Sequence, residues 1–398
     1  MRTVAGLTTT VLLTSFATFL TCCTVADPPL TADEAHRLAG SSNARDLFEL
    51  AARSLKNPLR VRLTSNDGPD DKSRPSAQLV AVVRSNPSIL GWIAQALKRK
   101  LSMDDLHHGV AFQDFGSDFT VFAWGRRLTD FACEAGDVAL SEGHVKEALA
   151  DDELGFGIGT KFLADGSIIP EGIDGAALES TARRAIERVA PQLAADDLAR
   201  SAKFLASAAA SHRPFQEVLL SDFRVQEAML ENIGGGYATP SDILAHRRQI
   251  SEAVVQRDTG VFARRSPLSP RADQGSVGDT AGPRYDESAP VFDQAWFASL
   301  NDQTEDCLLA LKLASKAYRR QRSTWPKRIQ DLSPTFIGHV PDDPFMPGRP
   351  LRMRAAGADL VIYSVGPDGV DNGGRPVAGK LTAYSKGDVV EMVSASQR

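Results

Sequence analysis

The strongest constraint on the fold is a series of apolar stripes with helical spacing that runs from about residue 31 to residue 256. Apolar residues that recur every three or four positions mark one face of an α-helix. The stripes are Ile89, Ile93, Ala96 and Leu97; Val121, Trp124, Leu128 and Phe131; Leu178, Ala182, Ile186 and Val189; Leu198, Ala202, Leu205 and Ala209; and Phe215, Leu219, Phe223 and Leu230. They predict a mostly α-helical domain over residues 27–260, built as a bundle or an irregular helical array.

Residues 1–26 have the pattern of an export signal. Arg2 precedes a moderately apolar stretch over residues 4–20, which several Thr residues make too polar and too short for a membrane span. Small residues at 24–26 suit an ordinary signal peptidase, whereas Cys22 suits lipidation; an uncleaved N-terminal anchor is the alternative. The sequence therefore predicts a periplasmic or cell-envelope protein, with a possible membrane tether at the N-terminus.

Four cysteines in 398 residues are too few for a disulfide-rich scaffold. Two of them, Cys133 and Cys307, lie on the apolar faces of predicted helices and outside the signal. Export permits a disulfide between them, but a buried free cysteine behaves as a small apolar residue, and this is the favoured interpretation.

The glycines before Thr160-Lys161 lack the spacing and the preceding strand of a phosphate-binding loop.

A polar segment separates the helical region from the end of the chain. From Ser266 to Pro290 the sequence is rich in Ser, Pro, Gly, Asp and Arg, which is typical of a tether. We therefore predict a linker over residues 261–292 and a second domain over residues 293–398.

The second domain has the pattern of an α+β fold. A helix capped by Asn301 or Asp302 would present Cys307, Leu308, Leu311, Ala314 and Tyr318 on its apolar face. Alternating Leu351 and Met353 predict a strand, and residues 360–363 predict the strand that returns after a turn at 356–359. The domain should therefore contain one helix packed on a small antiparallel sheet.

After these strands, the segment 364–374 and the later Gly387-Asp388 combine acidic residues with several glycines. In this order, the signals over residues 305–390 resemble the globular part of the major pseudopilin of type II secretion systems. The resemblance implies the helix-on-sheet fold and a calcium site in the loop after the last long strand. Matched position by position, Asp368 and Asp388 would be calcium ligands and Val365 would offer its carbonyl.

The residues support the same chemistry independently, because calcium prefers oxygen ligands on a chain that glycines allow to turn tightly. Asp371 adds a further carboxylate to the loop. The alternative is that Asp-Gly and Asn-Gly pairs only form turns, without a metal. Because the chain has no prepilin N-terminus, we do not expect it to be a filament subunit itself.

The sequence predicts no catalytic residue. It contains neither Gly-x-Ser-x-Gly nor His-Glu-x-x-His, and a formal net charge of −5 gives no reason to expect nucleic acid as a partner. The leading hypothesis is a non-enzymatic scaffold or interaction protein of the cell envelope, with a protein partner there. The alternatives are an exported enzyme of unknown class, with Asp368 and Asp371 as metal ligands, and an accessory component of a type II secretion or type IV pilus-like machine.

Overall fold

The structure is a computed structural model that describes residues 29–56, 75–102, 116–166, 168–232 and 289–395. Its helices are α2 (Ala32–Gly40), α3 (Ala44–Ser54), α4 (Ala77–Ser85), α5 (Ile89–Ala96), α7 (Gly116–Ser141), α8 (Val145–Asp165), α9 (Ile169–Val189), α10 (Ala195–Ser211), α11 (Phe215–Asn232) and α13 (Ala289–Arg322). The predicted signal at residues 1–26 and most of the predicted linker lie outside the described residues.

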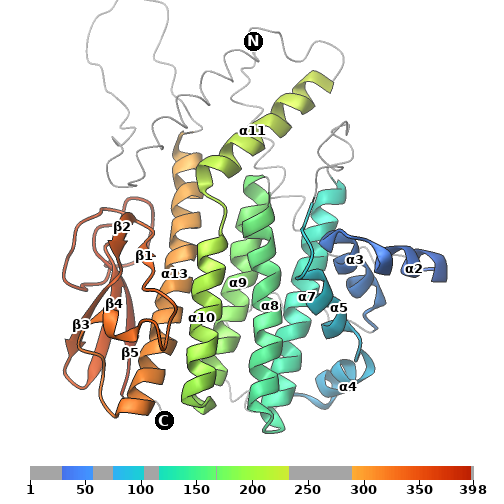
Figure 1. The fold of residues 1–398 in the computed structure, drawn as a ribbon. Coiled ribbons are helices and arrows are strands. Elements are labelled where there is room, and N and C mark those ends of the chain that lie inside the picture. Colours follow the sequence, from blue (N-terminus) through green and yellow to red (C-terminus); the bar gives the residue numbers. More distant parts are fainter. Residues whose placement is uncertain (1–28, 57–74, 103–115, 167, 233–288, 396–398) are drawn as a thin grey trace, which may run out of the picture.

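The long helices stand side by side in a row that ends at a small sheet. In Figure 1, α13 lies between α10 and the sheet, while α2 to α5 lie at the far side, where α3 and α4 pack against α7. Short turns join α7 to α8 and α8 to α9, so these neighbours are antiparallel. Among the described helices, none is both long and apolar enough to cross a membrane.

The sheet contains β3 (Arg352–Ala356), β4 (Asp359–Ser364) and β5 (Val389–Val393), in antiparallel order β3-β4-β5. Gly357, with φ of 65°, allows the tight turn between β3 and β4 where the sequence predicted one. A separate two-stranded ladder pairs β1 (Asp342–Asp343) with β2 (Met346–Pro350). The chain is thus mostly helical, with a small antiparallel sheet near its C-terminus.

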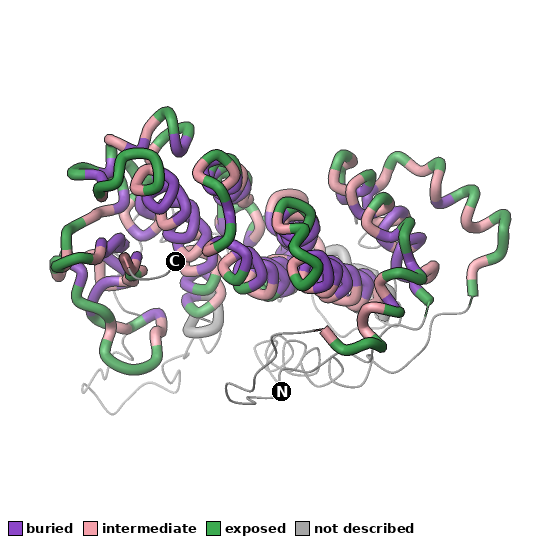
Figure 2. The backbone as a smooth tube through the Cα atoms, turned by 90° about the horizontal axis from the view of Figure 1, so that it is seen from below, coloured by how far each residue is buried: buried purple, intermediate pink, exposed green. Residues whose placement is uncertain are grey.

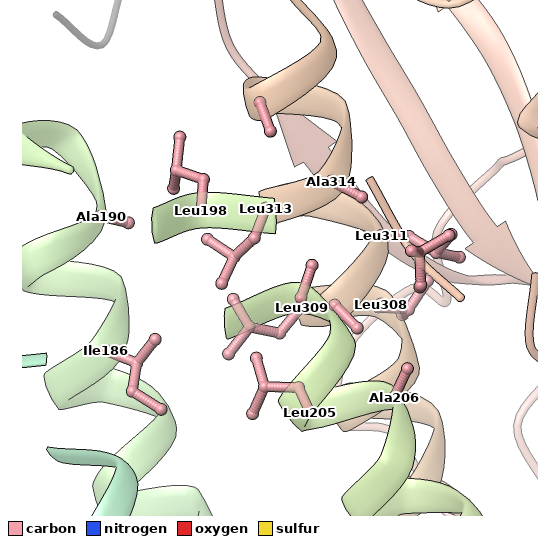
Figure 3. Close-up of a cluster of buried hydrophobic side chains, with 14 of the residues drawn as sticks. Ile186, Ala190, Leu198, Leu205, Ala206, Leu308, Leu309, Leu311, Leu313 and Ala314 are labelled. Atoms are coloured by element: carbon pink, nitrogen blue, oxygen red, sulfur yellow. The ribbon is translucent and has the colours of Figure 1, made fainter. Parts of the chain in front are cut away.

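One hydrophobic core continues from the helices into the sheet region. It combines Ile186 and Leu205 of α9 and α10 with residues of α13, β4 and β5. Figure 3 shows Leu309 and Leu313 of α13 on the side of α10, and Leu308 and Leu311 on the side of the strands. The view along the helices in Figure 2 shows buried residues following the inside of the row. The predicted second domain, which we call the head (residues 293–398), therefore shares its core with the helical part.

The predicted start of the last long helix is wrong. Asn301 and Asp302 were expected to cap it, but α13 begins at Ala289, inside the predicted linker. The extra turns place Trp296 and Phe297 in a third core cluster with Phe215 of α11. Because of this extension, Asp302 lies within a helix and is buried instead of exposed at a helix end.

Candidate metal centre

Four side chains from distant parts of the sequence meet in the interior. Glu179 lies on α9, His212 directly follows α10, and Asp302 and Asp306 lie one turn apart on α13. One ligand atom from each residue lies within 4.8 Å of the others. The side chains of Glu179 and Asp306 are fully buried, and those of His212 and Asp302 are 5% exposed. We call these four residues the metal cluster, since the group could hold a metal ion.

Two glycines bring α8 close enough to α9 to support Glu179. A Cβ atom on Gly159 would lie 2.6 Å from the carbonyl oxygen of Gly175 and 2.6 Å from Cγ of Glu179. Only glycine fits at the point where α8 and α9 cross, because any side chain there would collide with the other helix. This crossing allows the Thr160 hydroxyl to donate a hydrogen bond of 2.6 Å to Oε1 of Glu179. The other carboxylate oxygen, Oε2, remains for the metal cluster.

Arg183 supports the two aspartates from the opposite helix. It lies one turn after Glu179 on α9, and its guanidinium donates to Oδ1 of Asp302 at 2.7 Å and to Oδ1 of Asp306. It also donates to Oε2 of Glu305 at 2.9 Å, whose side chain is 44% exposed. A buried guanidinium with fixed donor directions holds carboxylates in one orientation. Each aspartate therefore has one oxygen bound by Arg183 and one oxygen left over.

With the three acids ionised, the oxygen and nitrogen atoms that are left over have no hydrogen-bond partner among the described residues, whereas a proton on Asp306 or Glu179 would join these two carboxyl groups by a hydrogen bond. The atoms left over are Oε2 of Glu179, Nε2 of His212, and Oδ2 of both Asp302 and Asp306. Buried polar atoms without a partner are rare and costly, and an ion absent from a structure is one common reason for them. All four members of the metal cluster thus contribute one unpartnered, buried ligand atom.

The distances fit coordination of a shared ion. Nε2 of His212 lies 3.3 Å from Oε2 of Glu179 and 3.5 Å from Oδ2 of Asp306, contacts that are ion pairs if the imidazole is protonated. Ligand atoms about 2.1 Å from a tetrahedral zinc ion lie about 3.4 Å from each other. The imidazole and the two carboxylates are therefore spaced as ligands around a common point.

The charges of this region are not balanced by protein groups. Glu179, Asp302 and Asp306 are three buried acids facing one buried base, Arg183. If all three acids are ionised and His212 is neutral, two negative charges are left over, which is the charge that a divalent cation neutralises; a protonated His212 pairs with Glu179 and Asp306 and leaves one. Glu305 is half exposed, so water can solvate its charge.

The pKa values reflect the same imbalance. Burial, and then the charge of Glu179, raises the pKa of Asp306 well above its ordinary value. Burial, and then the charge of Asp302, does the same to the pKa of Glu179. Burial also raises the pKa of Asp302 to about 6, although the Arg183 charge opposes the change. Without a cation, the interior therefore resists full ionisation of these acids.

His212 differs from the other members because it lies in a turn and not in a helix. Its backbone is extended after the last residue of α10, with ψ of 131°. The next residue, Arg213, donates its backbone N–H to the carbonyl of Leu163 at 3.0 Å and a guanidinium N–H to Gly166 at 3.0 Å. The turn between α10 and α11 is thereby anchored to the end of α8.

Two cavities border His212. The larger has a volume of about 520 Å³ and lies between the end of α10, α13 and the segment 339–347; Arg213, Gln303, His339 and Asp343 border it. The smaller, of about 90 Å³, lies between α9, α11 and α13 and is mainly apolar. The three acidic members of the metal cluster border neither cavity.

The residues predicted to bind calcium lie in the loop between β4 and β5, where their carboxylates organise the backbone. Asp388 is buried and accepts N–H groups of Asn372, Gly374 and Arg375, the shortest at 2.6 Å. Asp368 accepts the N–H of Gly387 at 3.0 Å. The same interactions bring the two ends of the loop together.

The other two predicted residues are engaged differently. Asp371 pairs with Arg352 at 3.0 Å and accepts the N–H of Gly373. The backbone N–H of Val365 donates to Oδ2 of Asp343 at 2.9 Å. Among the described residues, the loop aspartates do not form a group of three acidic or histidine ligands of the kind seen at Glu179. Calcium binding in this loop stays a prediction.

No pattern in the sequence predicted the metal cluster. Asp302 was interpreted as a helix cap, and Glu179, His212 and Asp306 were assigned no role. A weak signal was present: Glu179 and Arg183, like Asp302 and Asp306, are polar pairs with the i, i+4 spacing of one helix face. Such pairs are common on exposed faces, so the burial that makes them exceptional became visible only in the fold.

The cysteines and the glycine-rich stretch behave as predicted. Cys133 on α7 and Cys307 on α13 are both free and buried. Burial raises the pKa of both thiols, so neither is a reactive thiolate. The glycines before Thr160 lie inside α8, without a preceding strand, where they permit close helix packing.

Comparison of the chain with protein-family models, with curated proteins and with solved structures finds no match.

Proposed function

We propose that this chain is a non-enzymatic scaffold protein of the cell envelope, in which a divalent transition metal ion joins the helical part to the head. The ion would be held by Glu179, His212, Asp302 and Asp306. The observation that carries this proposal is the set of four buried ligand atoms, one from each residue, that lack hydrogen-bond partners among the described residues.

The ligand chemistry selects the class of metal. Imidazole nitrogen combined with carboxylate oxygens suits zinc, manganese or iron(II), whereas calcium and magnesium prefer oxygen ligands alone. His212 therefore argues against calcium at this centre. Zinc is the most useful probe, because it has no redox chemistry and accepts four ligands of these types.

The positions of the ligands favour a structural role over a catalytic one. Structural zinc sites are closed by protein ligands, whereas catalytic sites keep a coordination position open to substrate. Here the three carboxylates are buried and border neither of the two cavities next to His212. The ion would connect α9, the end of α10 and α13, and α13 in turn packs on the sheet. Metal binding would therefore stabilise the junction between helices and head.

The location and the partner are proposed from the sequence. The N-terminal pattern supports export to the periplasm or envelope, with lipidation at Cys22 or Cys23 as the tether. The resemblance of residues 305–390 to a pseudopilin head supports a protein partner in the envelope. An affinity purification of the exported full chain from envelope extract, compared with the same extract without it, tests this directly.

The test of the metal centre is a stability measurement on the purified full chain after removal of metals with a chelator. We expect zinc to stabilise the wild type by about 2.7 kcal/mol when its free concentration is a hundred times the dissociation constant. Asp306→Asn should abolish the effect. Glu305→Gln is the matched control, because Glu305 also contacts Arg183 but is not a member of the cluster. No zinc effect on the wild type, or an equal effect on D306N, contradicts the proposal.

One observation favours a second function, an exported metal-dependent enzyme. The larger cavity borders His212 and has further titratable side chains in its wall, including His339 and Asp343. In such an enzyme the substrate would occupy this cavity, and a substrate or product analogue should protect His339 from chemical modification. Assays of the zinc-loaded chain with ester, peptide and phosphate substrates, compared with D306N, would decide between the two functions.

Calcium in the head is a separate proposal that rests on the resemblance. It would have to compete with the backbone N–H groups that the loop aspartates accept, and Asp368→Asn should then remove any calcium-dependent rise in the melting temperature. An accessory role in a secretion or pilus-like machine likewise rests on the resemblance, and capture of machine subunits in the envelope purification would support it.

A further inference from the structure

We propose that metal ions reach and leave the metal cluster through the larger cavity, past the side chain of His212, which acts as a gate. This inference rests on the proposed function, and it adds the route and the moving part. It follows from where the four ligands lie relative to the cavities, from which ligand can move independently, and from the nature of the two cavity walls.

The side chains of the metal cluster differ in whether they can be reached from the two cavities. The side chains of Glu179 and Asp306 are fully buried, and Asp302 and Arg183 are 5% and 8% exposed. Of the four cluster members, His212 alone borders a described cavity. An ion that enters from either cavity must therefore pass the imidazole.

The side chain of His212 can move more freely than those of the three acids. Glu179, Asp302 and Asp306 lie within α9 and α13, whose neighbouring side chains form the main hydrophobic core. Separating these helices would expose that core. His212 lies in the turn between α10 and α11. We therefore expect a change of its side-chain rotamer to open the path without moving a helix. Side-chain rotation is faster and less costly than the separation of packed helices.

The two cavities differ in the polarity of the residues that border them. The smaller cavity, of about 90 Å³, is bordered mainly by apolar residues such as Phe162, Ile169 and Val218. The larger, of about 520 Å³, offers Gln303, His339 and Asp342, whose oxygen and nitrogen atoms can replace part of the hydration shell. A hydrated divalent ion loses its water at a high cost in an apolar passage. The larger cavity is therefore the route.

Two alanines provide a matched pair of variants. Ala210 on α10 borders only the larger cavity, and Ala298 on α13 borders only the smaller one. Both side chains are exposed and helical, so Ala210→Trp and Ala298→Trp add the same bulk to each rim in the same kind of position. Neither residue offers a ligand atom to the cluster, so we expect the equilibrium affinity for zinc to stay the same in both.

The experiment measures zinc release from the loaded full chain into excess chelator, and zinc uptake by the metal-free chain, with equilibrium affinity measured alongside. We expect A210W to slow both rates by about tenfold or more at unchanged affinity, and A298W to leave them unchanged. Slowing in A298W alone, or in neither variant, overturns the route. If the wild type binds no zinc at equilibrium, the proposed function fails as well, so the two failures are distinguished.

Discussion

Gly159 on α8 and Gly175 on α9 face each other so closely that a Cβ atom on Gly159 would lie 2.6 Å from the Gly175 carbonyl oxygen. The same added atom would lie 2.6 Å from Cγ of Glu179, a member of the metal cluster. The close packing of two helices and the position of a metal ligand thus depend on the same missing side chain.

Gly159→Ala should therefore lower both stability and metal affinity. Overpacking at a tight contact costs about 1–3 kcal/mol, and relief of the clash would displace Glu179. Urea unfolding with and without zinc measures both effects. The matched control is Gly172→Ala on α9, where an added Cβ meets nothing within 4 Å. That change should stabilise the chain by about 0.5–1 kcal/mol, because alanine favours the helix. Equal effects of the two substitutions would argue against the close crossing.

Arg183→Met should be strongly destabilising. Removal of the guanidinium leaves Asp302 and Asp306 buried without their donors, and breaking a buried ion pair in this way costs about 3–5 kcal/mol. Its neighbour Arg184 is exposed on the same helix, so Arg184→Met should change the free energy of unfolding by less than about 0.5 kcal/mol. Chemical denaturation of both variants without metal is the measurement. A loss of less than about 1 kcal/mol in R183M would show that the guanidinium is not essential.

Asp388→Ala should destabilise the head by about 2–3 kcal/mol, since three backbone N–H groups lose their acceptor. Asp359→Ala is a comparison with one backbone N–H at stake, that of Ala395, and should cost less. The loss in D388A should occur with or without calcium. If the loss disappears when calcium is removed from both proteins, the carboxylate serves mainly as a calcium ligand.

A second group of buried acids, away from the metal cluster, makes stability depend on pH. Burial raises the pKa of Asp152 on α8 to about 8, and Oδ1 of this residue has no hydrogen-bond partner among the described residues. Since the folded pKa lies above the unfolded one, the protonated acid favours the folded state. The stabilisation is complete below about pH 4 and is lost as the pH rises through 8.

Asp152→Asn removes this titration and keeps the shape of the side chain. The free energy of unfolding of the wild type, relative to D152N, should fall by about 2–4 kcal/mol between pH 5 and pH 9. Asp33→Asn provides a control, because Asp33 is exposed on α2 and its charge is not among those that shift the pKa of Asp152. Parallel pH profiles for the wild type and D152N would show that Asp152 ionises without penalty in the folded chain.

Local patterns predicted much of the fold. The stripe from Leu178 to Val189 predicted the second half of α9, and the residues at 356–359 predicted the turn between β3 and β4. These features depend on periodicity and turn chemistry, which neighbouring residues determine. The start of α13 was mispredicted, because Asp302 has the properties of a helix cap and its burial depends on α9.

The metal cluster could not be predicted in the same way. His212 is a single histidine after a helix, and its partners at 179, 302 and 306 approach it only when α9, α10 and α13 pack together. No spacing in the sequence reports that approach. The acidic loop with Asp368 and Asp388 attracted the metal prediction because its residues are close in sequence, and their carboxylates accept hydrogen bonds from the loop backbone.

The central claim is that one divalent transition metal ion lies between Glu179, His212, Asp302 and Asp306. Its most direct test is a crystal of the zinc-loaded full chain, with anomalous diffraction recorded on both sides of the zinc absorption edge. We predict one peak about 2.0–2.2 Å from Nε2 of His212 and from the carboxylate oxygens. Well-defined density at this position that holds only water, or directly hydrogen-bonded carboxyl groups without an anomalous peak, would contradict the claim.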